Sequence, residues 1–320
     1  MDNKIEKINV PWLEIPVTEH CNLKCKGCTH HSPYLKPCFY DYEQYVKDIN
    51  ILKDIYHVKI LIFLGGEPLL NKGISEYIAF AREAKIADIY RITTNGLLLM
   101  KMNDDFFKVI DEIKVSLYPN IGIDKNKLET FLKEKSNIYK FNYSIREFED
   151  FIDIETDRLS DEDAQINFNK CDRRRNGHLV YNGYYYKCMR PVSTKQFLEH
   201  NNPNVDVPDF RIEDGILLNG ENLKFRLQQY IKCDGNLLSC HYCLLGFNEK
   251  GLLDKLKSIV VNNDVLTKFI YNSRGLYSLY KYIEKKSNNR KDRIAHKTKK
   301  VVNLFKHQQL SKGEYDDISS

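Results

Sequence analysis

The first half of the chain alternates between short apolar runs and longer helix-like segments, and this alternation constrains the fold more than any other feature. The clearest run, from Val58 to Leu64, holds one charge among apolar residues, which is typical of a strand buried on both faces. Strands that alternate with helices form right-handed parallel crossovers. The sequence therefore predicts an α/β fold with an open, partial (β/α) barrel. Strands are predicted at 12–17, 58–64, 89–93, 113–117 and 138–143, and helices at 42–55, 74–84, 104–110 and 125–135.

Three cysteines follow the first predicted strand in the spacing C-x3-C-x2-C: Cys21, Cys25 and Cys28. Three thiolates spaced in this way can bind three irons of a cubane iron–sulfur cluster, which normally takes four cysteines. The next cysteine, Cys38, lies across two prolines. One iron of such a cluster therefore stays open for chemistry. A zinc knuckle is the alternative for so short a cysteine run.

The second predicted strand ends in a sequence suited to binding a ligand through main-chain atoms, Gly65-Gly66-Glu67-Pro68. Glycines let a ligand approach the backbone N–H and C=O groups closely, and Glu67 adds a negative acceptor. An ordinary strand-to-helix turn is the alternative for the glycines alone. Together with the cysteine triplet, however, this edge resembles the radical S-adenosylmethionine (SAM) superfamily, which carries C-x3-C-x2-C after the first strand and a GGEP-type edge after the second.

The resemblance implies both the cofactors and the residues that hold them. The three cysteines would hold a [4Fe–4S] cluster, the amine and carboxylate of SAM would chelate its open iron, and the GGEP edge would receive the methionyl amine. Thr94 and Asn95, after the third predicted strand, would lie near the ribose and sulfonium, and Ser116 in the fourth would contact the ribose. For these three residues, a polar side chain with an ordinary loop role is the alternative.

One position departs from the pattern of the superfamily. The residue before the third cysteine is usually bulky and lies near the adenine, but here it is Gly27. Stacking on the adenine is then expected from Tyr34 or Tyr40, or is replaced by backbone contacts. In this superfamily an electron passed to the sulfonium releases a 5′-deoxyadenosyl radical, which abstracts hydrogen from an unactivated C–H bond.

Composition and length agree with a cytoplasmic enzyme. The 320 residues are 42% apolar, enough for one large domain with a smaller appendage, and no apolar run approaches the length of a membrane span. The polar, charged start is unlike a signal peptide. An oxygen-sensitive cluster requires a reducing compartment, so the nine cysteines are interpreted as metal ligands rather than disulfides, and a flavodoxin- or ferredoxin-type reductant is expected.

The net charge of +5 is modest and predicts no nucleic-acid partner. Much of it lies between Lys285 and Lys300, which indicates a solvated basic surface or, alternatively, a helix that contacts an anionic partner or membrane. The predicted domains are a partial barrel at 1–150, a cluster-binding domain at 151–250 and a helical, basic extension at 251–320.

A β-hairpin is predicted between two of the later cysteines. Residues 178–187 alternate in character around Asn182-Gly183, a strong two-residue turn signal. Eleven residues separate Cys171 from Gly183, and four separate Gly183 from Cys188. The hairpin would therefore return Cys188 toward Cys171.

A second pair of thiols, Cys240 and Cys243, follows a predicted helix at 223–231. The whole arrangement resembles the C-x(9–15)-G-x4-C opening of the SPASM and Twitch extensions, which hold auxiliary iron–sulfur clusters after the radical SAM barrel. The single-cluster Twitch form fits better because the full SPASM cysteine set is absent. The resemblance assigns Cys171, Cys188, Cys240 and Cys243 to an auxiliary [4Fe–4S] cluster, with Cys233 as a substitute ligand. Structural zinc is the alternative.

The predicted substrate is a small carbohydrate or cyclitol. The chain resembles a polysaccharide-associated group of radical SAM proteins, and also 2-deoxy-scyllo-inosamine dehydrogenase, a Twitch enzyme that oxidises a secondary alcohol. An auxiliary cluster would accept the electron of the substrate radical. Alcohol oxidation also needs a base, for which Arg146, His178 or residues 184–186 are candidates.

Two other activities remain open at this point. An epimerase would return hydrogen to the opposite face of the substrate from a thiol, for which Cys38 or Cys233 is left over. A ribosomal-peptide maturase would carry a leader-binding segment, usually before the barrel, and barely a dozen residues precede the first predicted strand.

Overall fold

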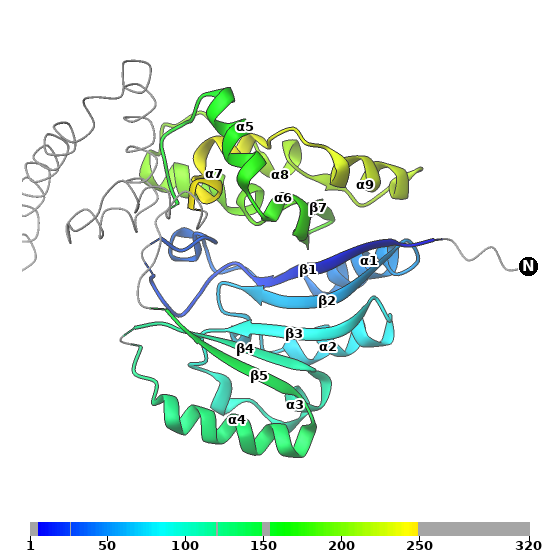
Figure 1. Ribbon diagram of the computed structural model, residues 1–320, viewed down its shortest axis with the longest axis vertical. Coiled ribbons are helices and arrows are strands. Elements are labelled where there is room, and N and C mark those ends of the chain that lie inside the picture. The colour runs from blue at the N-terminus through cyan, green and yellow to red at the C-terminus, as the bar shows by residue number, and fades with distance from the viewer. Residues whose placement is uncertain (1–5, 26, 120, 149–153, 249–320) are drawn as a thin grey trace, which may run out of the picture. The chain divides into compact units, whose positions relative to one another are not determined.

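The computed structural model describes residues 6–25, 27–119, 121–148 and 154–248 (Figure 1). Those up to Gly246 belong to one compact unit. The predicted extension at 251–320, with its basic cluster, lies outside the described residues. No helix within the described ranges has the length and apolar character needed to cross a membrane.

Among the described residues, one sheet of eight strands organises the fold, in the order β5-β4-β3-β2-β1-β6-β7-β8. The strands are β1 (Ile8–Thr18), β2 (Tyr56–Gly65), β3 (Ala87–Thr94), β4 (Glu112–Leu117), β5 (Asn142–Glu147), β6 (Gly177–Tyr181), β7 (Tyr184–Tyr186) and β8 (Ile216–Leu217).

Helices connect these strands along the chain. The α-helices are α1 (Tyr42–Leu52), α2 (Ile74–Glu83), α3 (Asp104–Val109), α4 (Lys125–Tyr139), α5 (Asp161–Lys170), α6 (Arg173–Asn176), α7 (Arg190–Asn201), α8 (Phe210–Glu213) and α9 (Leu223–Lys232). Short 3-10 turns are η1 (Ser32–Tyr34), η2 (Pro68–Leu70), η3 (Leu99–Lys101), η4 (Leu238–Tyr242) and η5 (Leu245–Asn248).

Strands β1 to β6 are joined in parallel pairs, and β7 and β8 add antiparallel pairs at the edge. In Figure 1, helices α1 and α2 lie behind strands β1 to β3, so the opposite face of the sheet is turned to the viewer. The predicted partial barrel is therefore confirmed. Because the strands run in parallel, the carboxyl ends of β1 to β5 share one edge of the sheet, which we call the rim.

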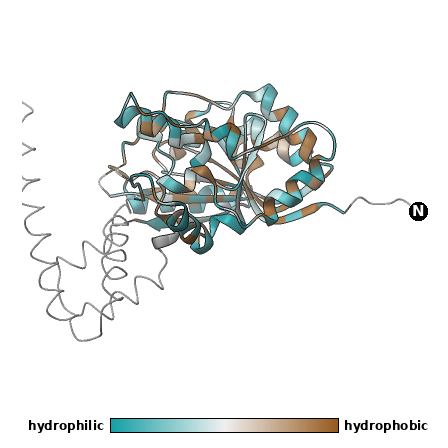
Figure 2. Cartoon of the chain, turned by 90° about the horizontal axis from the view of Figure 1, so that it is seen from above, coloured by the Kyte–Doolittle hydropathy of each residue, from teal (hydrophilic) through white to brown (hydrophobic). Residues whose placement is uncertain are grey.

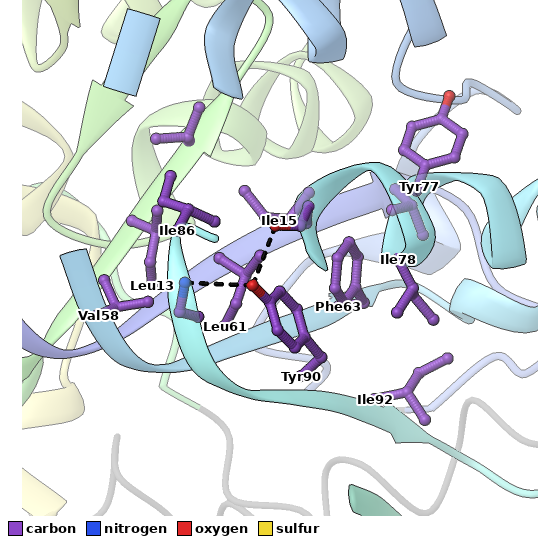
Figure 3. Packing of buried hydrophobic residues seen from close by; sticks show 14 of the residues in the cluster. Leu13, Ile15, Val58, Leu61, Phe63, Tyr77, Ile78, Ile86, Tyr90 and Ile92 are labelled. Carbon is purple, nitrogen blue, oxygen red and sulfur yellow. Dashed lines mark hydrogen bonds between the residues drawn. The ribbon is translucent and has the colours of Figure 1, made fainter. Parts of the chain in front are cut away.

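The core lies between the sheet and helices α1 to α4, and it is built by alternation along each strand. Leu13 and Ile15 of β1 are fully buried, as are Leu61 and Phe63 of β2 (Figure 3). Tyr90 adds a polar group that is satisfied inside the core, since its hydroxyl donates to the carbonyl of Ala81 at 3.0 Å and accepts from the N–H of Ala87 at 3.3 Å. The helices show the matching pattern of one hydrophobic and one hydrophilic side (Figure 2).

The strand predicted at 138–143 is wrong in position. Helix α4 continues to Tyr139, and β5 begins only at Asn142. Ile138 points outward with 64% of its surface exposed, and the helix ends at Lys140 in a left-handed conformation. An apolar pair in the last helical turn therefore resembled the start of a strand.

The predicted hairpin is confirmed as β6 and β7. Asn182 and Gly183 both have positive φ, 47° and 80°, as a two-residue turn of this kind requires. The N–H of Gly183 donates to the carboxylate of Asp48 in α1 at 2.8 Å. Strand β6 pairs directly with β1, so the sheet runs across the domain boundary predicted at residue 150.

Candidate active site

The cysteine triplet lies on the loop that follows β1, and its three thiols influence one another. Burial raises the pKa of Cys21, and burial together with the two neighbouring thiols, Cys28 and Cys21, raises the pKa of Cys25 to about 11. The sulfur of Cys21 accepts from the N–H of Leu23 at 3.4 Å and from the side-chain amide of Asn95 at 3.7 Å. Donors of this kind stabilise a thiolate. All three cysteines are half-buried.

The two glycines of the GGEP edge are required because this edge packs on the backbone of the cysteine loop. The N–H of Gly66 donates to the carbonyl of Thr18, and that of Glu67 to the carbonyl of His20, both at 3.0 Å. A Cβ atom at Gly65 would lie 2.1 Å from the oxygen of Thr18, and one at Gly66 would lie 2.0 Å from that of His20. Residues with side chains would push the cysteine loop away.

The side chain of Glu67 joins the ends of β2 and β3. It is fully buried and accepts from the Thr94 hydroxyl at 2.6 Å, the Asn95 N–H at 2.8 Å and the Leu69 N–H at 3.1 Å. Burial raises the pKa of Glu67 to about 7, while these hydrogen bonds act in the opposite direction. This bracing role is not visible in the sequence pattern, which suggests only a ligand contact.

The rim continues with Asn95, Ser116 and Tyr118. The amide of Asn95 donates to the side chain of Asn22 on the cysteine loop at 2.8 Å. Tyr118, which follows β4, also lies near that loop. Burial raises the pKa of Tyr118 to about 12, and the second cause of this rise is the nearby thiol of Cys25. Sequence reasoning missed Tyr118, although it stands two residues after Ser116, just beyond the end of β4.

A cavity of about 580 Å³ opens at the carboxyl ends of β4 and β5. The ring of Phe148 belongs to its lining and stacks on that of Tyr118, with ring centroids 5.2 Å apart. Its volume is within the range of small-molecule sites. The residues that line it are Leu117, Tyr118, Pro119, Ile121, Gly122, Ile123, Glu147 and Phe148.

The expectation that Tyr40 stacks on an adenine is wrong. Tyr40 is 1% exposed, and its hydroxyl donates to Asp48 in the core. Tyr34 packs edge-on against Phe197 of α7, with ring centroids 5.1 Å apart. The aromatic pair at the rim is instead Tyr118 and Phe148.

The four C-terminal cysteines assigned together, Cys171, Cys188, Cys240 and Cys243, are gathered in the structure. Burial raises the pKa of Cys171 to about 11, and the second cause is the neighbouring thiol of Cys243. Burial likewise raises the pKa of Cys188 to about 12, and here the second cause is the thiol of Cys171. Burial and then the thiols of Cys188 and Cys243 place the pKa of Cys240 well above its usual value. Cys233 is exposed, and its thiol is not among the main influences on the pKa values of these four cysteines.

Basic groups surround this cysteine group. Lys187 is 2% exposed, and its ammonium donates to the carbonyl of Cys233 at 2.5 Å. Arg173 hydrogen-bonds to the buried Glu14. Thiols of the cysteine group lie close enough to Arg173 and Arg190 to raise the pKa of both guanidinium groups. Several anionic thiolates could therefore be neutralised here. Among the described residues, no three His, Cys, Asp or Glu side chains form a site for a single metal ion.

A buried polar bridge links the two cysteine regions. Arg190 and Glu155 form two parallel hydrogen bonds of 2.7 Å, and Arg190 also donates to the carbonyl of Tyr242 at 2.7 Å. His31 lies 2.8 Å from Glu155 and 3.0 Å from the hydroxyl of Ser193, and its ring stacks on Phe197. His31 follows the first cysteine group by three residues, and Arg190 follows Cys188 by two.

Acid is expected to weaken this bridge. Burial is the main cause that lowers the pKa of His31 to about 4, and the charge of Arg190 is the second. For Glu155, burial alone would raise the pKa, but Arg190 and His31 outweigh burial and hold the pKa at about 2. Both groups therefore bind a proton more readily when unfolded. The free energy of unfolding should fall from about pH 6.5 to 4 through His31, and from about pH 4.5 to 2 through Glu155.

Urea unfolding of the protein between pH 7.5 and pH 4.5 measures this effect. His31→Gln should flatten the upper part of the pH dependence. An unfolding midpoint that stays constant over this range would contradict the assignment.

The remaining catalytic candidates are dispersed. His178, Tyr185 and Tyr186 are buried in the core, where the Tyr185 hydroxyl lies 2.6 Å from both His178 and Tyr56. They are therefore not positioned as bases at the rim, contrary to the expectation from the sequence.

Cys38 and Arg146 are both exposed. The sulfur of Cys38 lies 3.8 Å from the hydroxyl of Tyr181, at the end of β6. The guanidinium of Arg146, on β5, lies 4.7 Å from the ring centroid of Phe148. Both are near the rim, but β5 and β6 are separated by four strands of the sheet, so the two residues lie far apart along it.

Part of the first half of the chain is similar to known proteins. Residues 15–156 match the Radical SAM superfamily. The GTP 3′,8-cyclase of Thermodesulfovibrio yellowstonii is 35% identical over 133 residues, 39% of each chain, and that of Desulforamulus reducens is 29% identical over 156 residues, 46% of this chain and 44% of the relative. The chain thus spans about two-fifths of the length of these relatives.

Two solved structures are also similar to the chain. BtrN in complex with AdoMet and 2-DOIA aligns with a TM-score of 0.45 and 17% identity, over 72% of this chain and 93% of that one. The peptide complex of anSMEcpe with AdoMet aligns with a TM-score of 0.40 and 13% identity, over 74% and 91%.

Proposed function

Residues 15–156 match the Radical SAM superfamily, and we propose that this protein is a radical SAM enzyme that oxidises an alcohol carbon of a carbohydrate or cyclitol with the help of a second iron–sulfur cluster. A [4Fe–4S] cluster and SAM are the cofactors that this superfamily implies. The observation that supports the proposal most is that Cys171, Cys188, Cys240 and Cys243 influence one another's pKa values beside the buried cations Lys187 and Arg190.

The N-terminal residues fit their cofactors. Cys21, Cys25 and Cys28 offer three mutually close thiols, and two N–H donors already face the sulfur of Cys21. The backbone of the GGEP edge is fixed against the same loop and is suited to hold the methionyl amine. The aromatic pair of Tyr118 and Phe148 offers a face for the adenine.

When bound, these cofactors supply a 5′-deoxyadenosyl radical that removes a hydrogen atom, and an auxiliary cluster would supply an acceptor for the remaining electron. The chain supplies position and protection. Glu67 fixes the ends of β2 and β3, so the residues around the reacting carbon keep their geometry. The bridge of Glu155 and Arg190 ties the C-terminal region to the cysteine loop.

The C-terminal residues fit a cluster because they bring four thiols and compensating charge. The N–H of Leu245 donates to the sulfur of Cys243 at 3.4 Å, a contact that is common around metal-bound thiolates. Arg173, Lys187 and Arg190 offset the negative charge that four thiolates bring. A structural zinc would give the same ligands no redox role.

Anaerobic reconstitution tests the proposal directly. Wild-type protein should bind about eight irons per chain, two cubanes, and should cleave SAM reductively to 5′-deoxyadenosine. Cys240→Ser should lower the iron content to about four, because one ligand of the second cluster is removed. Cys233→Ser is the matched control and should keep about eight.

Replacing Cys21, Cys25 and Cys28 together by alanine should abolish SAM cleavage and leave about four irons. Cyclitols and sugars are then screened for a product that has lost two hydrogens. Zinc in place of iron at the C-terminal site, or a full iron content in Cys240→Ser, would contradict the second cluster. Absence of 5′-deoxyadenosine from the wild type would contradict the enzyme class.

Epimerisation is the second candidate, because the exposed Cys38 lies beside the Tyr181 hydroxyl and could return a hydrogen atom. The two activities differ in heavy water. An epimerase would place deuterium on the reacting carbon through the exchangeable thiol, whereas a dehydrogenase yields a carbonyl product.

A further inference from the structure

The sheet face opposite α1 and α2 carries a row of polar side chains on β3, β4 and β5. Side chains alternate along a strand, and residues directly opposite on neighbouring strands share a face. Ile113 and Val115 of β4 pack in the core, so their strand neighbours face the other way. The strand register then groups eight residues, which we call the polar wall: Arg91, Glu112 and Asn142; Thr93, Lys114 and Ser144; Ser116 and Arg146.

The polar wall adjoins the candidate active site. Ser116 is at the end of the polar wall nearest the rim, two residues before Tyr118, which lies near the cysteine loop. Lys114 is two residues further down β4, about 7 Å along the strand. A substrate that reaches the rim from this face of the sheet would therefore lie within reach of Lys114.

The charges of the polar wall are not balanced. It contains three cations and one carboxylate, Glu112, and this carboxylate is held by Arg91 at 2.6 Å. Among the described residues, neither Lys114 nor Arg146 forms an ion pair. Lys114 is half-buried, and its cross-strand neighbours Thr93 and Ser144 carry hydroxyls rather than carboxylates.

A lysine on this face whose ammonium has no carboxylate partner among the described residues offers a charge that a bound anion can use. The two flanking hydroxyls and the ammonium are together a donor set for the oxygens of a phosphate. A neutral polyol offers no such compensation, and a carboxylate has fewer oxygens to occupy three donors.

We propose that Lys114, between Thr93 and Ser144, binds the phosphate of the substrate, which is a phosphorylated sugar or cyclitol. The inference rests on the proposed function, whose substrate class it narrows. Arg146, two residues nearer the rim on β5, adds a second positive charge on the same face. The reacting carbon would then lie between the phosphate and the cysteine loop.

Binding measurements on the anaerobically reconstituted protein test this inference. Calorimetric titration compares glucose 1-phosphate, glucuronate and glucose as probes. Wild-type protein should bind glucose 1-phosphate at least about tenfold more tightly than the other two. Lys114→Met should weaken that binding about 10- to 100-fold, and Lys114→Arg should retain most of it.

Lys127→Met is the matched control, because Lys127 is an exposed lysine on α4, and its replacement should change nothing. Binding of glucose 1-phosphate that is undetectable, equal to that of glucose, or unchanged in Lys114→Met would overturn the inference. Equal binding of glucuronate would overturn the choice of phosphate. Reductive SAM cleavage, measured on the same samples, separates the two hypotheses. If the wild-type protein does not cleave SAM, the proposed function is contradicted, whereas phosphate binding at Lys114 is judged by the titrations alone.

Discussion

Replacing Arg190 by methionine is expected to lower the free energy of unfolding by about 3–5 kcal/mol. The substitution leaves the buried carboxylate of Glu155 without its cation and removes the hydrogen bond to the carbonyl of Tyr242. Both cysteine regions should loosen, because His31 contacts the same carboxylate. Urea unfolding, with iron content measured in parallel, gives both quantities.

An exposed ion pair supplies the control. Lys125→Met breaks the pair with Glu147, in which both side chains are about half exposed, and should cost about 0–1 kcal/mol. The double variant Glu155→Gln with Arg190→Met should recover part of the loss, since no unpaired charge remains buried. A loss in Arg190→Met no larger than in Lys125→Met would show that the bridge has no structural weight.

Gly66→Ala is expected to cost at least about 3 kcal/mol and to remove SAM binding. The new methyl group would lie 2.0 Å from the carbonyl oxygen of His20, and it would meet main-chain atoms that cannot rotate away. Either the cysteine loop or the GGEP edge must shift, and the thiols of the triplet shift with the loop. Calorimetric titration with SAM and thermal unfolding together measure the effect.

Gly73→Ala is the matched control for the added methyl group. Gly73 has φ −84°, and a Cβ atom there meets nothing closer than 3.5 Å. Its cost should stay within about 1 kcal/mol, with SAM binding unchanged. Gly66→Ala protein that binds SAM as tightly as the wild type would refute the tight packing between edge and loop.

Local patterns were sufficient to predict most of the barrel. The apolar run of β2, the turn at Asn182-Gly183 and the helix that became α9 all carry their signal within a few neighbouring residues. The prediction failed where the local signal was ambiguous. Ile138 and Tyr139 end a helix, yet an apolar pair followed by Phe141 fits the start of a strand equally well.

The candidate site was predictable only as a set of motifs. Cys21, Cys25 and Cys28 share one loop, so their spacing identifies them. His31, Glu155 and Arg190 are separated by 124 and 35 residues, and no periodicity connects them. Their pairing is decided by tertiary packing, which a single sequence does not display.

The pairing of β6 with β1 has a consequence for recombination with related enzymes. Trp12, Leu13 and Glu14 lie between two strands, and their segment of β1 pairs with β2 along one edge and with β6 along the other. The C-terminal cysteine region is therefore not a detachable cassette. A chimera that exchanges it must also supply a strand matched to residues 12–14, or the donor and recipient halves will expose unpaired backbone where the native sheet is continuous.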